Sequence, residues 1–68
     1  GIISYAYFKI PAEAATEDNM EIVLALDGVE DVNMNSAKGT MAITYVNRQT
    51  TEEKLLSEIK AEGIEVKK

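Results

Sequence analysis

The sequence predicts an α+β domain in which a four-stranded antiparallel sheet carries two helices on one face. The first observation is the stretch from Leu26 to Tyr45, where a helical spacing of apolar residues ends at Gly28 and apolar residues then fall at every second position. This alternation is interrupted only at residues 37–39, as in a hairpin. The second observation is the length. A chain of 68 residues has room for one thin core, so we expect residues 1–68 to form a single domain.

The first half of the chain predicts a strand, a loop and a helix. Residues 3–10 are rich in β-branched and aromatic side chains and end at Pro11, which favours a strand. A loop is expected to follow through Ala15. Thr16 is a suitable N-cap, and the acidic residues of the next turn complement the helix dipole. We expect this first helix to end near Gly28.

The second half predicts a hairpin, a helix and a last strand. Strands are expected at residues 32–36 and 40–46. A capping box from Thr50 to Glu53 starts the second helix, and a short strand at residues 64–66 closes the domain. The order is βαββαβ, the ferredoxin-like arrangement, with both helices on one face of the sheet.

The first strand has apolar residues on both faces, which bears on function. We place Tyr5 and Tyr7 inward, so that Phe8 lies on the water-facing side, where it is either partly covered or part of a contact surface. The expected core consists of Ile3, Tyr5, Tyr7, Ile10, Met20, Val23, Leu26, Val29, Val32, Met34, Met41, Ile43, Tyr45, Leu55, Leu56, Ile59 and Val66.

Composition excludes several classes of function. The chain has no cysteine and no histidine, which excludes disulfides, thiolate chemistry and imidazole ligands. Twelve acidic and seven basic residues give a net charge of −5, which disfavours nucleic acids and direct membrane contact. No apolar run is long enough to span a bilayer, and no segment resembles a signal peptide. The serines have no base nearby, so we expect no enzymatic activity. We also expect no cofactor. The expected location of the domain is the cytoplasm.

The spacing of several motifs resembles a known family. The Leu-Asp-Gly-Val stretch at residues 26–29, the hairpin at 37–39 and the Glu-Gly-Ile ending at 62–64 resemble the heavy-metal-associated domain of copper chaperones and of metal-transporting P-type ATPases. In that family, the loop before the first helix carries Met-Thr-Cys-x-x-Cys. Its two thiolates hold a soft ion such as Cu(I). The resemblance therefore directs attention to the loop of this chain.

Aligned on Gly28, the two cysteine positions of the family fall on Ala12 and Ala15. The neighbours of these vestigial metal-loop positions are Pro11, Glu13, Ala14 and Ile64. Alanine offers no lone pair, so we expect no metal to be held here. Glu13, Glu17 and Asp18 could loosely attract a hard cation, but the loop lacks the calcium-binding pattern, and dipole-complementing surface charge is the favoured interpretation.

The resemblance implies a heavy-metal-associated-like domain without its metal-binding cysteines. We interpret it as a non-catalytic regulatory or docking module of a metal-transport or metal-handling protein, monomeric in isolation. Its partner is expected to be a protein with a basic surface, another heavy-metal-associated domain being one candidate. The alternative is a copper or heavy-metal chaperone or transporter domain in a cysteine-to-alanine form, which otherwise binds and transfers Cu(I). The expected partner-binding residues are Glu13, Glu17, Asp18, Glu21 and Phe8.

Overall fold

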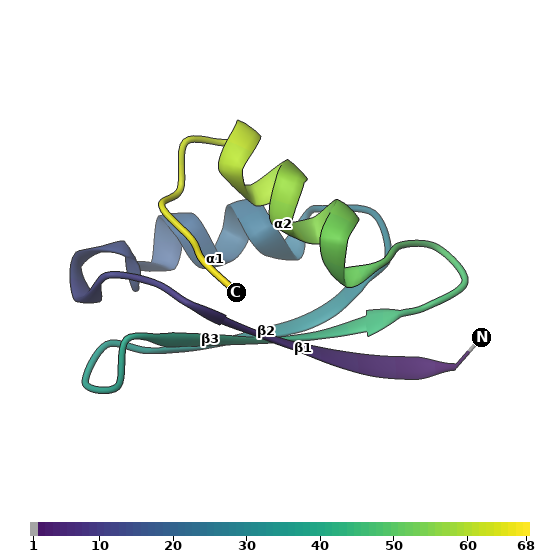
Figure 1. The fold of residues 1–68 in the computed structure, drawn as a ribbon, viewed down its shortest axis with the longest axis horizontal. Coiled ribbons are helices and arrows are strands. Elements are labelled where there is room, and N and C mark those ends of the chain that lie inside the picture. Colours follow the sequence, from purple (N-terminus) through teal and green to yellow (C-terminus); the bar gives the residue numbers. More distant parts are fainter. Residues whose placement is uncertain (1) are drawn as a thin grey trace.

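A computed structural model describes residues 2–68 and places two helices on one face of an antiparallel sheet (Figure 1). The elements along the chain are β1 (Ile3–Lys9), a 3-10 turn η1 (Ala12–Ala14), α1 (Glu17–Leu24), β2 (Val29–Asn35), β3 (Thr40–Val46) and α2 (Glu52–Ala61). This order agrees with the expected one as far as the second helix. Among the described residues, no helix has the length and apolar character required to cross a membrane.

Within residues 2–68 the sheet has three strands in the order β1-β3-β2, and the predicted fourth strand is wrong. After Gly63 the chain descends from the end of α2 and reaches β1 only near its end (Figure 1). There it forms one isolated bridge, in which the Lys9 N–H donates to the Lys67 carbonyl at 2.7 Å and the Lys67 N–H donates to the Lys9 carbonyl at 2.9 Å. Ile64 and Val66 instead fill the core, each about 5% exposed or less.

The predicted orientation of β1 is also wrong, because its register with β3 reverses the two faces. Phe8 lies opposite Met41 and Ala6 lies opposite Ile43. Directly opposed residues share a face of the sheet, and both β3 residues are fully buried, so Phe8 is only 2% exposed. It cannot contribute to a contact surface. The residues of β1 that face away from the helices are Ile3, Tyr5, Tyr7 and Lys9.

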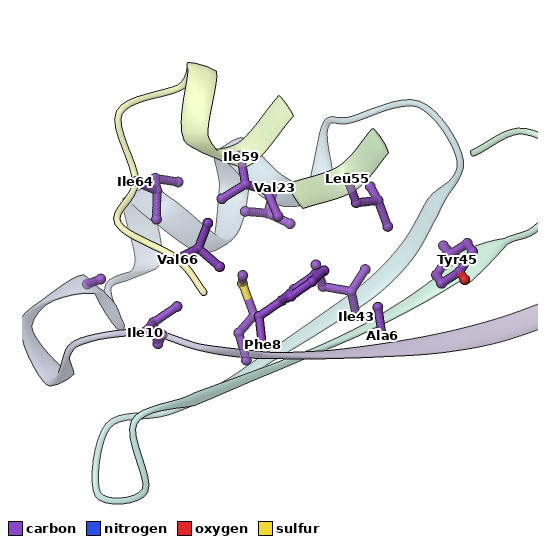
Figure 2. Packing of buried hydrophobic residues seen from close by; sticks show 12 residues of the cluster. Ala6, Phe8, Ile10, Val23, Ile43, Tyr45, Leu55, Ile59, Ile64 and Val66 are labelled. Atoms are coloured by element: carbon purple, nitrogen blue, oxygen red, sulfur yellow. The ribbon is translucent and has the colours of Figure 1, made fainter. Parts of the chain in front are cut away.

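The core lies between the sheet and the two helices (Figure 2). Its buried members are Ala6, Phe8, Ile10, Ala14, Val23, Met41, Ile43, Tyr45, Leu55, Ile59, Ile64 and Val66. Several side chains that were expected inside are only partly buried, because they lie at the margin of this cluster near the β2 edge or on the flanks of the helices. These are Met20, Leu26, Val29, Val32, Met34 and Leu56.

One helix cap is confirmed and the other moves by one residue. The Thr16 hydroxyl accepts a hydrogen bond from the Asn19 N–H at 3.1 Å, as an N-cap should. In α2 the cap is Thr51, whose hydroxyl accepts from the Lys54 N–H at 3.2 Å. The predicted cap, Thr50, is instead 4% exposed, and its methyl group packs beside Gly28.

This packing restricts Gly28 to glycine, which a substitution can test. Gly28 has φ of +85°, and an added Cβ would lie 2.8 Å from Thr50 Cγ2, whereas Gly63 has φ of +86° and nothing within 4 Å. Gly28→Ala should lower the free energy of unfolding by about 2–4 kcal/mol, from a left-handed backbone and overpacking together. Gly63→Ala should cost about 1–2 kcal/mol from the backbone alone. Urea unfolding followed by circular dichroism measures both, and equal costs would show that Thr50 yields without strain.

Candidate functional site

The loop between β1 and α1 is a single tight turn. Pro11 precedes it in an extended conformation, with φ −68° and ψ 152°. The Ala14 N–H donates to the Pro11 carbonyl at 2.9 Å, and the Ala15 N–H donates to the Ala12 carbonyl at 3.1 Å. Side chains three residues apart eclipse one another in such a turn. Ala12 and Ala15 therefore lie on the same side of it, directly before α1.

The turn is anchored to the rest of the domain through Ala14. Its carbonyl accepts hydrogen bonds from the Thr16 N–H and from the Asn19 side-chain amide, both at 2.9 Å. Ala14 is 8% exposed and belongs to the core cluster that includes Ile10 and Ile64. Figure 2 shows Ile10 at the end of β1 and Ile64 in the C-terminal segment pointing toward one another beside the loop. The turn thus has one buried position and an outer side that carries Ala12 and Glu13.

The residues of this loop do not fit the soft metal ion that the family motif holds. Methyl groups at Ala12 and Ala15 offer no lone pair, and the chain contains no cysteine or histidine that could replace them. Within residues 2–68, no three acidic side chains gather closely enough to hold an ion instead, and this includes Glu13, Glu17 and Asp18. The loop forms its turn, but positions 12 and 15 have no side-chain atoms that could bind the metal ion.

The surface that follows the loop is acidic. Glu13, Glu17, Asp18 and Glu21 are all exposed. The segment 10–37 contains seven acidic residues and no lysine or arginine. Within this segment α1 packs against β2, which forms one edge of the sheet. Acidic residues therefore follow one another along the loop, α1 and β2, while Lys9 and Lys67 lie with Pro11 at the base of the loop.

An exposed face of α1 adds apolar area to this charge. Asp18, Glu21, Ile22 and Ala25 line a shallow depression on the helix. Their spacing of three, four and seven residues places them on one side of an α-helix. The sequence predictions contain the two acidic residues but neither Ile22 nor Ala25, although the helical spacing could have identified them. We call these four residues together with Glu13 and Glu17 the acidic face.

The comparisons with known proteins agree with this division between scaffold and loop. The heavy-metal-associated domain family matches residues 20–65, a span that begins after the loop. A solved structure of the CsoZ metallochaperone has a similar fold, with a TM-score of 0.73 and 22% sequence identity, over 96% of this chain and 97% of that one. No curated protein sequence matches. The match to more than half of the chain shows that it belongs to the heavy-metal-associated domain family, as a member without the cysteines of the metal-binding motif.

Proposed function

We propose that this domain is a non-catalytic docking module of a cytoplasmic metal-handling system. Its acidic face would bind a protein partner that carries a basic surface. The observation that carries the proposal is the loop itself, which keeps its turn and its anchor at Ala14 although both donor positions hold alanine. A surface that recognises a partner by shape and charge does not need the ion, so it can persist after the donors are gone.

The distribution of charge supports this role. The acidic residues of the face are exposed and lie in a segment without a basic residue, so no lysine or arginine of that segment neutralises them. Rim charges of this kind steer association and select partners, and they contribute less to the final affinity. Ile22 and Ala25, which line the depression on α1, provide apolar surface that a bound partner would bury.

The kind of partner follows from the family. A second heavy-metal-associated domain with lysine or arginine around its own loop would complement the charge of the acidic face. The fold similarity to a metallochaperone supports a place in metal handling, where such domains meet one another. In this role the domain would regulate or recruit the partner, and the metal would stay with the partner.

A second candidate is a Cu(I)-transfer domain in a cysteine-to-alanine form. One observation favours it: Ala12 and Ala15 still lie on the same side of one turn, the relation that two chelating thiolates require. The codons at positions 12 and 15 of the encoding gene separate the two candidates. Alanine codons support the docking module, and cysteine codons support the transfer domain.

Charge reversal on the acidic face tests the docking proposal. The ¹⁵N-labelled domain is titrated with a heavy-metal-associated domain that carries a basic loop surface, and amide shifts are followed. We expect saturable shifts in residues 12–25. The triple variant Glu13→Lys, Glu17→Lys, Asp18→Lys should bind about tenfold more weakly or worse, since each exposed charge contributes up to about 1 kcal/mol.

The matched control reverses three exposed acidic residues outside the face, with the same change in net charge. These are Glu30, Glu53 and Glu62. If the control variant loses as much affinity as the first triple variant, net charge alone drives the binding and the acidic face is not the docking surface. If the control variant keeps its affinity for the partner and the first triple variant loses it, the proposal is supported.

A further inference from the structure

The two edges of the sheet are built differently. β2 carries an irregularity in its pairing between Val29 and Asp31, and it has charged residues at Glu30 and Asp31. Bulges and charges are the devices that prevent an edge strand from pairing with another chain. β1 pairs regularly with β3 along its whole length, and residues 3–8 include no charge and no proline. The edge at β1 is therefore the unprotected one.

The backbone of β1 offers hydrogen-bonding groups at this open edge. In an antiparallel ladder the N–H and C=O of successive residues point alternately to the two sides of the strand. Lys9 bonds outward to Lys67, so Tyr7, Tyr5 and Ile3 point their groups in the same direction. Among residues 2–68, no strand lies on that side of them. Three N–H donors and three carbonyl acceptors are thus free for a further strand.

The side chains of the same three residues are apolar and exposed. Ile3 is 44% exposed, Tyr5 62% and Tyr7 68%. Figure 1 shows that both helices lie on one face of the sheet, and the alternation of β1, with Ala6 and Phe8 buried, places these three residues on the other face. An incoming strand would therefore gain aromatic cross-strand contacts in addition to backbone hydrogen bonds.

We propose that β1 pairs antiparallel with β1 of a second copy, which joins the two sheets into one of six strands. The two-fold axis passes through Tyr5, so that Tyr5 faces Tyr5 of the second copy and Ile3 faces Tyr7. This register uses every free backbone group of the three residues. A register centred on Ala6 would instead place Ile3 opposite Lys9, whose groups already bond to Lys67.

The self-complementary register favours a second copy as the occupant, and the net charge of −5 on each copy keeps the association weak. Residues 2–8 are uncharged, and antiparallel pairing holds the two Lys9 side chains at opposite ends of the joint. The acidic residues of α1 and β2 lie toward the far edge of each sheet, because α1 packs on β2. The two negative sides therefore lie at the outer ends of the joined sheet, where their repulsion is smallest. The contact is short, which places the dimer in the weak, transient class.

This proposed dimer differs from the sequence-based expectation, which was a domain that is monomeric in isolation. It leaves the acidic face on α1 free, so the dimer and the docking function can fail independently. Sedimentation equilibrium of the domain from micromolar to millimolar concentration measures the association directly. We expect the average mass to rise toward that of a dimer over this range.

Charged substitutions at Tyr5 provide the decisive experiment, because this residue meets its own copy. Tyr5→Lys and Tyr5→Glu alone place like charges opposite each other, and each should weaken self-association by about tenfold or more. An equimolar mixture of the two variants should associate again as a heterodimer, which loss of folding cannot explain. Thr44 pairs with Tyr5 on the central strand and serves as the control position.

The outcomes separate an edge contact from other forms of association. Thr44→Lys should leave the dimer unchanged if the strands pair edge to edge. If it disrupts association as strongly as Tyr5→Lys, the copies stack through the faces of their sheets and the proposal is wrong. A wild-type mass that stays monomeric at millimolar concentration, or a mixture of the two Tyr5 variants that fails to associate, overturns it as well.

Discussion

Restoring cysteine at Ala12 and Ala15 is expected to convert this chain into a Cu(I)-binding domain. The two positions lie on the same side of the η1 turn, directly before the positive end of the α1 dipole, where thiolates are favoured. Two thiolates suit a soft monovalent ion. The gain should be on the order of 10 kcal/mol, the scale of thiolate metal sites in small domains. Competition with a Cu(I) chelator of known affinity under anaerobic conditions measures it.

The control places the second cysteine one position earlier. In the variant Ala12→Cys, Ala14→Cys, one sulfur replaces the methyl group of Ala14, which is 8% exposed and points into the core. The two sulfurs then lie on different sides of the turn, and the affinity should be lower by several orders of magnitude. Equal affinity of the two double variants would show that the loop rearranges freely and that its turn does not preorganise the site. If neither double variant binds Cu(I), then the two sulfur donors alone are not sufficient to form the metal site in this chain.

The turn at Gly28, the hairpin and β3 could be predicted well because local signals determine them, whereas β2 begins at Val29, three residues before its predicted start, and α1 ends at Leu24, before its predicted end near Gly28. Gly28 adopts φ of +85° where the helical spacing ends, and β3 has the boundaries that its alternation predicts. The cap at Thr16 could also be predicted, since a hydroxyl before an acidic turn satisfies the free N–H groups whatever the tertiary structure. Signals of this kind need no information about distant residues.

The features that could not be predicted depend on partners far away in sequence. β1 has apolar side chains on both faces, and only its register with β3 decides that Phe8 is buried and Tyr7 exposed. The fourth strand failed for the same reason, because β propensity at residues 64–66 cannot show where the chain leaves α2. At the candidate site, the positions of Ala12 and Ala15 followed from the resemblance. The anchor that Asn19 provides to the Ala14 carbonyl had no local signal.

Phe8→Ala and Tyr7→Ala form a matched pair that tests the orientation of β1. Both remove an aromatic ring from neighbouring positions of one strand, yet Phe8 is 2% exposed and Tyr7 is 68% exposed. Phe8→Ala should lower the free energy of unfolding by about 3–5 kcal/mol, because it leaves a cavity against Met41 between the sheet and the helices. Tyr7→Ala should cost less than about 1 kcal/mol. A domain of this size has little stability to lose, so Phe8→Ala should be largely unfolded.

Urea unfolding at low micromolar concentration measures the pair without interference from self-association through β1. Phe8→Leu provides the control for Phe8, since it keeps most of the buried volume and should recover more than half of the lost stability. The opposite ranking, with Tyr7→Ala more damaging than Phe8→Ala, would return the tyrosines to the core. It would also remove the exposed aromatic edge on which the dimer rests, because the alternation of the strand allows only one of the two faces to be buried.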